Sequence, residues 1–153
     1  MRRVILAGTA PAGGEGISNA GALLQDAIAK AGAEDRHPKH LLFFRSSKDS
    51  QKAADAFLSR LSERKEDRDV AVTNEAIHAQ VTAITKWGMA ATGSLGAIKQ
   101  PVLVVNGDND IMAPTINSVE LARKLPNAEL SIFPDAGHGA NVFVDQALRF
   151  LQD

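Results

Sequence analysis

Two stretches decide the fold of this chain: Pro101–Pro114, P-V-L-V-V-N-G-D-N-D-I-M-A-P, and Phe133–Gly139, F-P-D-A-G-H-G. In each case a short apolar run, V-L-V-V or L-S-I-F, predicts a buried parallel strand. The loop after the first run carries Asp110, and the loop after the second carries His138. Open α/β sheets place their sites at the carboxyl ends of parallel strands. We therefore expect a carboxylate and an imidazole to meet at one edge of a sheet.

The rest of the sequence predicts one more strand and several helices. V-I-L-A at 4–7 is a strand candidate, and the spacing of apolar residues predicts helices over 18–31, over 52–64 and after Thr73. From residue 100 the expected order is strand, helix, strand, helix. Because parallel strands need helices to cover them, the fold class is α/β. We expect a short three-stranded parallel sheet with flanking helices and a helical insertion of roughly 80 residues.

Particular residues predict where the helices begin, end and pack. Ser18, Thr73 and Thr115 are expected at helix starts, and Gly32 is expected to stop the first helix. In the last helix, apolar residues recur at the helical spacing i, i+3, i+4 and i+7. These residues are Val144, Ala147, Leu148 and Leu151.

Composition excludes several classes of function. The 153 residues are 44% hydrophobic and 23% charged, carry a net charge of −1 and contain no cysteine. These values give no electrostatic case for binding nucleic acid or an anionic membrane, and no apolar run is long enough to span a bilayer. Disulfides, zinc–thiolate sites and a cysteine nucleophile are excluded. No phosphate-binding or dinucleotide-binding motif is present, and we expect neither a cofactor nor a metal. The apolar stretch V-I-L-A near the N-terminus is too short for the core of a signal peptide, so we expect a cytoplasmic protein.

The two loops carry a specific resemblance. Their pattern resembles the C-terminal half of α/β-hydrolase-fold enzymes, within the group of esterases, lactonases and cofactor-free haloperoxidases. The family's G-x-x-D-x-x-x-P loop matches Gly107, Asp110 and Pro114, and its G-H turn matches Gly137 and His138. The resemblance implies a catalytic acid at Asp110 and a catalytic histidine at His138.

The resemblance also implies a division of the chain. L-A-G-T at 6–9 looks like the end of the family's sixth core strand. Residues 1–14 would then be the first core strand and its loop, residues 15–95 a helical cap, and residues 96–153 a βαβα core tail.

One family motif is missing from these 153 residues. The family's nucleophile stands in a G-x-S-x-G turn upstream of the sixth strand, and no such motif is present. The nearest imitation, T-G-S-L-G with Ser94, lacks the first glycine and does not lie on a strand-to-helix turn. The oxyanion-hole donors of the family come from the same missing region.

The proposed chemistry has plainer alternatives. Histidine can take and return a proton near neutral pH, and a carboxylate fixes its tautomer and orientation. However, His138 could be a surface loop residue, and D-N-D is a common turn. Asp108 and Asp110 could instead suggest a hard-metal site, although a third ligand is not evident. Trp87 and Met112 could line an acyl pocket or could pack in the core.

The resemblance therefore implies a hydrolase of ester or related acyl substrates, represented here by its acid/base portion and expected to be inactive alone. The alternative is a non-catalytic remnant or interaction module with the same fold, so the sequence does not decide whether the chain is an enzyme. An unpaired apolar strand at 4–7 would invite another chain. We expect a homo-oligomer, or pairing with a separate N-terminal half that would complete a site for a small acyl substrate.

Overall fold

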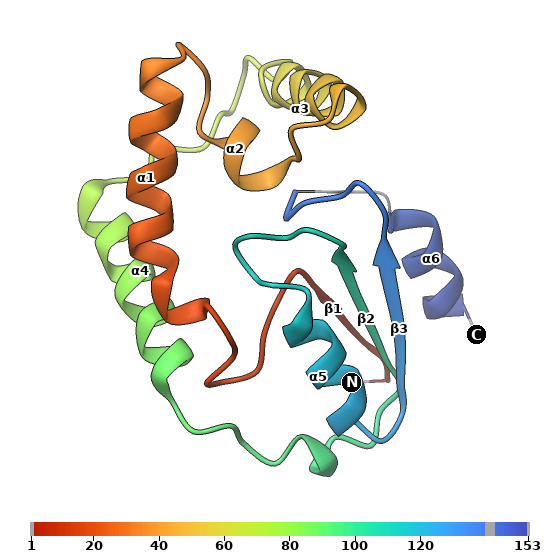
Figure 1. Cartoon of the computed structure of the whole chain (residues 1–153). Coiled ribbons are helices and arrows are strands. Elements are labelled where there is room, and N and C mark those ends of the chain that lie inside the picture. The colour runs from red at the N-terminus through yellow and green to blue at the C-terminus, as the bar shows by residue number, and fades with distance from the viewer. Residues whose placement is uncertain (1, 140–142, 153) are drawn as a thin grey trace.

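The computed structural model describes residues 2–139 and 143–152, in which three parallel strands form one sheet of order β1-β2-β3 (Figure 1). The α-helices α1 to α4 lie between β1 and β2 in the chain, α5 lies between β2 and β3, and α6 follows β3. The elements are β1 (Val4–Ala7), η1 (Ile17–Asn19), α1 (Ala20–Ala33), α2 (Lys39–Phe43), α3 (Lys48–Leu61), α4 (Asn74–Met89), η2 (Leu95–Ala97), β2 (Val102–Gly107), α5 (Ile116–Lys124), β3 (Ala128–Phe133) and α6 (Val144–Gln152). The expected α/β class and three-stranded parallel sheet are confirmed.

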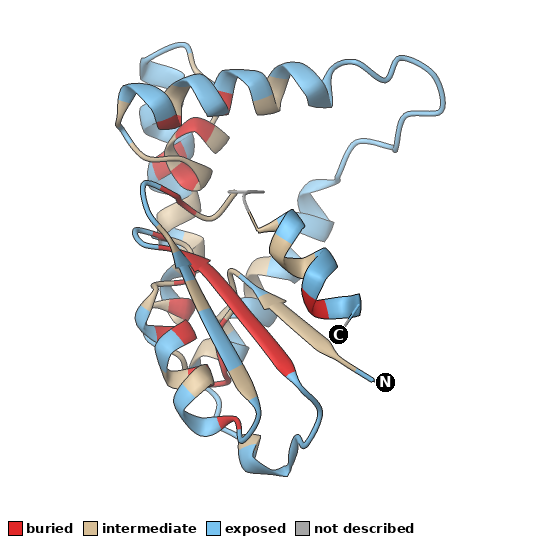
Figure 2. Cartoon of the chain, turned by 90° about the vertical axis from the view of Figure 1, so that its right-hand side faces the viewer, coloured by how far each residue is buried: buried red, intermediate tan, exposed pale blue. Residues whose placement is uncertain are grey.

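The middle strand β2 is the core of the sheet. It is buried along its whole length, while β1 and β3 are only partly buried, as the red ribbon in Figure 2 shows. Alternate side chains of β2 point to opposite faces. On one face, Val102 and Val104 pack against Leu121 and Leu125 at α5; on the other, Leu103 and Val105 pack with Phe150 of α6. Burial on both faces explains the unbroken apolar run.

Helices α2 and α3 lie over the carboxyl-terminal ends of the strands, and α1 and α4 pack side by side next to them (Figure 1). The chain approaches itself closely where α4 meets η1, since a Cβ on Gly88 would lie 2.3 Å from the backbone nitrogen of Ser18. Between α2 and α3, the buried His40 ring reaches Asp55 with an Nε2–Oδ1 distance of 2.9 Å. Because α2 and α3 lie over the strand ends, their side chains can reach the loops that follow β2 and β3.

Several expected helix ends differ from the structure. Ser18 lies in η1, and α1 begins at Ala20 without a side-chain cap. Gly32 does not stop α1, which continues to Ala33, because glycine only weakens a helix interior. Helix α3 begins at Lys48, four residues before the expected start, because Ser47 caps it by accepting the N–H of Ser50. Thr73 caps α4 as expected, by accepting the N–H of Ala76.

Helix α6 presents a different face to the sheet from the one its apolar spacing indicates. Val144, Leu148 and Leu151 are about half exposed, whereas Phe150 is buried against the sheet. Phe150 lies outside the regular spacing, and its ring packs with Leu103 and Val105 of β2. An apolar stripe is therefore left on the outer side of α6.

In residues 2–139 and 143–152, no helix has the length and apolar character needed to cross a bilayer.

Candidate active site

Asp110 is held by the loop that follows β2. Its side chain has no exposed surface, and its Oδ1 accepts the backbone N–H groups of Met112 and Ala113 at 2.8 and 2.9 Å. The loop itself is fixed by Asn106, whose buried amide donates to the carbonyl of Ala113, and by Thr115, whose hydroxyl donates to the carbonyl of Gly107. One carboxylate oxygen is thus used for the loop, and Oδ2 is left to face another partner.

That partner is His138. The distance from His138 Nδ1 to Asp110 Oδ2 is 2.8 Å, so the structure brings the two expected site residues into direct contact. A buried carboxylate accepts hydrogen bonds, which places the proton on Nδ1 and leaves the lone pair of the neutral ring on Nε2. The His138 side chain is 26% exposed, so the ring borders solvent while its partner does not.

Phe43, the last residue of α2, packs against the loop that carries His138. The Phe43 ring lies 5.5 Å from the His138 ring, measured between centroids, with an angle of 58° between the planes. The Phe43 carbonyl also accepts the N–H of Gly139 at 3.0 Å. Phe43 therefore contacts the imidazole with its ring and the next residue with its backbone.

An arginine joins the same helical region to both loops. The Arg45 guanidinium donates to both carboxylate oxygens of Asp108 at 3.2 and 3.3 Å and lies 3.8 Å from Asp135. Ser47 adds a hydrogen bond of 2.6 Å to Asp135. Because Asp108 follows β2 and Asp135 follows β3, this cluster fastens the two loops that carry Asp110 and His138 to each other.

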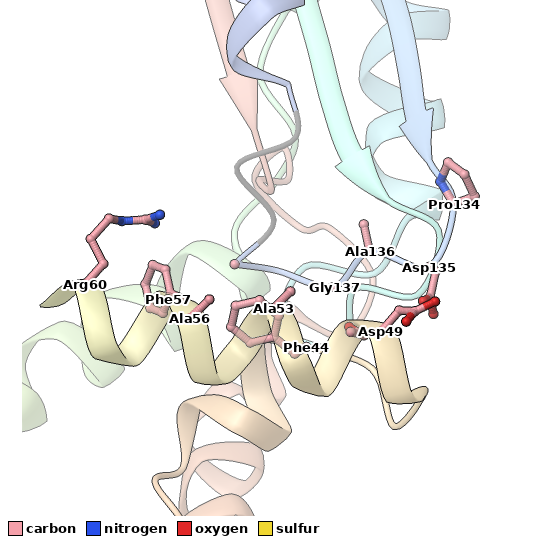
Figure 3. A pocket seen from close by; sticks show the side chains of 12 residues that line it. Phe44, Asp49, Ala53, Ala56, Phe57, Arg60, Pro134, Asp135, Ala136 and Gly137 are labelled. Atoms are coloured by element: carbon pink, nitrogen blue, oxygen red, sulfur yellow. The ribbon is translucent and has the colours of Figure 1, made fainter.

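Several cavities border the histidine loop. A groove of about 430 Å³ runs between α3 and the loop after β3, with Phe44, Ala53 and Phe57 on its apolar wall (Figure 3). Arg60 stands at one end of it, and Asp49 and Asp135 stand at the other. A smaller cavity of about 50 Å³ lies directly at His138.

The remaining sequence candidates take up other positions. The Trp87 indole donates to the carbonyl of Ala10 at 3.1 Å and fastens α4 to the loop after β1. The backbone of Met112 supports Asp110, and its side chain is half-buried. Ser94 is exposed and precedes η2, which Figure 1 shows at the amino-terminal ends of the strands, away from the histidine loop. A substrate-binding role for Trp87 and Met112 stays a prediction.

Sequence reasoning missed the residues that support the pair: Phe43, Arg45 and Asn106. Asn106 carried a signal, since an amide inside a run of buried apolar residues needs hydrogen-bond partners. Phe43 and Arg45 act through contacts with residues 63 to 96 positions further along the chain, which periodicity and local motifs do not report.

Comparison with a family of known proteins gives a match over most of the chain. Residues 22–143 match a family described as the alpha/beta hydrolase fold. Among curated proteins, homoserine O-acetyltransferase from Nostoc punctiforme is 46% identical over 50 residues, which are 33% of this chain and 14% of that protein.

Solved structures give the same result over the full chain. An alpha/beta hydrolase fold protein from Chitinophaga pinensis is 40% identical, with a TM-score of 0.86, and this chain covers 57% of that chain with 100% of its own length. An esterase from Exiguobacterium antarcticum is 17% identical, with a TM-score of 0.55 over 98% of this chain and 54% of the other. The chain thus spans little more than half the length of the solved relatives it matches.

Proposed function

The chain belongs to the alpha/beta hydrolase fold family, and from that membership we propose that it supplies the acid and base of an enzyme acting on esters or related acyl compounds. The observation that carries this proposal is the 2.8 Å contact between His138 Nδ1 and the buried carboxylate of Asp110. Both residues stand at the carboxyl ends of neighbouring parallel strands, where α/β folds place their sites.

In the proposed reaction, His138 is the general base. Its Nε2 takes the proton from a hydroxyl as that oxygen attacks the acyl carbon of the substrate, and it then gives the proton to the departing alkoxide. Asp110 holds the ring and stabilises the imidazolium that forms between these steps. Water repeats the sequence on the acyl intermediate and releases the acid.

We propose that the attacking hydroxyl comes from outside these 153 residues. The sequence contains no G-x-S-x-G turn, and Ser94 directly precedes η2, which lies at the amino-terminal ends of the strands in Figure 1. A second part of the proposal is that residues 15–95 act as a cap over the core formed by residues 1–14 and 96–153. Its support is the position of α2 and α3 over the strand ends (Figure 1).

The segment that carries the hydroxyl would dock on the open edge of β1. Among the described residues, β1 pairs with β2 alone. The chain exposes 9784 Å², whereas a folded monomer of 16.2 kDa is expected to expose about 7,500 Å². The excess is of the size that a permanent interface covers. We propose that another polypeptide segment, or failing that a second copy of this chain, covers this surface.

The test is reconstitution with the part of the Chitinophaga pinensis relative that this chain does not cover. The 153-residue chain alone should hydrolyse p-nitrophenyl acetate no faster than the same concentration of free imidazole. Addition of the complementing part should accelerate hydrolysis, and His138→Ala should abolish that acceleration. The control variant is His78→Ala, which replaces an exposed histidine of α4.

Two results would overturn the proposal. Acceleration that survives His138→Ala would remove the histidine from the chemistry. A folded complex that forms but gives no acceleration would favour a non-catalytic interaction module.

Because the curated relative is an acyltransferase by name, the products should also be analysed with an added alcohol. That analysis would reveal acyl transfer to an acceptor other than water.

A further inference from the structure

Gly8 lies directly against the hydrogen bond between Asp110 and His138. A Cβ placed on Gly8 would be 3.2 Å from His138 Nδ1 and 3.4 Å from Asp110 Oδ2, the two atoms that the bond joins. The backbone is fixed there, because the Gly8 N–H donates to the carbonyl of Val105 at 3.0 Å. The end of β1 therefore covers the bond from one side, while Phe43 packs on the imidazole.

We infer that Gly8 is a positioning residue for the base of the proposed reaction, and in that sense the inference rests on the proposed function. Without a side chain, Gly8 lets the end of β1 close over the bond and exclude water from Asp110 Oδ2. A methyl group would push the imidazole outward, where the ring already borders solvent. Water could then compete for the carboxylate.

The backbone conformation at Gly8 is a second reason for glycine there, and the experiment has to separate it from the steric reason. Gly8 has φ of +54°, in the left-handed region where other residues cost about 1–2 kcal/mol. Gly16 provides the matched control, with φ of +74° and a Cβ position 3.0 Å from the Pro114 ring. Gly8→Ala and Gly16→Ala share the backbone cost, but only the first places an atom against the Asp110–His138 bond.

The experiment is NMR of the whole chain with ¹⁵N-labelled histidine. A carboxylate-bound Nδ1–H gives a low-field proton signal, and Asp110→Asn identifies it by altering it. We expect Gly8→Ala to lose this signal, or to exchange the proton with water at least 10-fold faster, while Gly16→Ala keeps it. A folded Gly8→Ala that retains the wild-type signal and exchange rate would overturn the inference.

Gly8→Asn serves if Gly8→Ala does not fold, because asparagine tolerates the left-handed region better than alanine and still carries a Cβ. The same loss of signal is expected, and an unchanged signal would again overturn the inference. In the wild-type chain, the absence of a nuclear Overhauser effect between Gly8 Hα and His138 Hε1 would overturn it without any variant. The NMR signal reports the bond and not turnover, so the reconstitution experiment can fail independently of this test.

Discussion

Asp110 depends wholly on partners from the protein, because its side chain has no exposed surface. One oxygen accepts two backbone N–H groups of its own loop, and the other meets His138. The first set of bonds stabilises the loop, and the second sets the geometry of the proposed base. The two roles can be separated by substitution.

At Asp110, alanine and asparagine should affect stability differently. Asp110→Ala leaves the N–H groups of Met112 and Ala113 buried without an acceptor, which should lower the free energy of unfolding by about 1–3 kcal/mol for each group. Asp110→Asn keeps an amide oxygen for both groups and should cost less. Urea unfolding of the two variants measures the difference, and equal losses would show that the backbone bonds do not stabilise the loop.

The contact between Asp110 and His138 was easier to predict from the sequence than the residues around it. Asp110 and His138 stand in short motifs after apolar runs, so local sequence was enough to bring them together. Gly8, Phe43 and Arg45 reach the same place through the packing of helices and of β1, which no local pattern encodes. The contact between Trp87 and Ala10 was missed for the same reason.

At the scale of elements, burial on both faces makes β2 the most sensitive strand. Val104→Ala should lower the free energy of unfolding by about 2–3 kcal/mol, because Val104 is fully buried and its truncation also leaves a cavity. Val70→Ala is the matched control, with 93% exposure in the loop before α4, and should change stability by less than about 0.5 kcal/mol. Equal effects in chemical denaturation would contradict the assignment of the core to β2.

Strands were predicted more accurately than helix ends and helix faces. The run at 4–7 coincides with β1, and the apolar runs after residues 101 and 129 lie within β2 and β3. In α6 the apolar spacing predicts the wrong buried face. Its apolar residues recur at helical spacing but are about half exposed, whereas Phe150 is buried against β2. Spacing within a helix does not report the size of the space on the sheet that a side chain must fill.

At the scale of the whole molecule, the open edge of β1 should govern association. The N–H groups of Val4 and Gly8 donate to the carbonyls of Pro101 and Val105, on the β2 side. Because successive residues of a strand point their N–H groups to opposite sides, the N–H of Ala7 points to the open edge. Ala7→Pro removes that donor and should weaken self-association or docking of a complementing segment, while β1–β2 pairing is kept. Sedimentation of both variants, with and without the complementing segment, measures this.

A wild-type chain that sediments as a single 16.2 kDa species at all concentrations and binds no complementing segment would contradict that expectation. So would an Ala7→Pro chain that associates as strongly as the wild type. The exposed stripe on α6 would then be the next surface to examine by substitution.

The most direct measurement of the central claim is to locate the nucleophile. A fluorophosphonate labels an activated serine, and mass spectrometry of the reconstituted complex identifies the labelled peptide. The account predicts an adduct on the complementing segment that disappears with His138→Ala. An adduct on Ser94 or on any other serine of these 153 residues would contradict it.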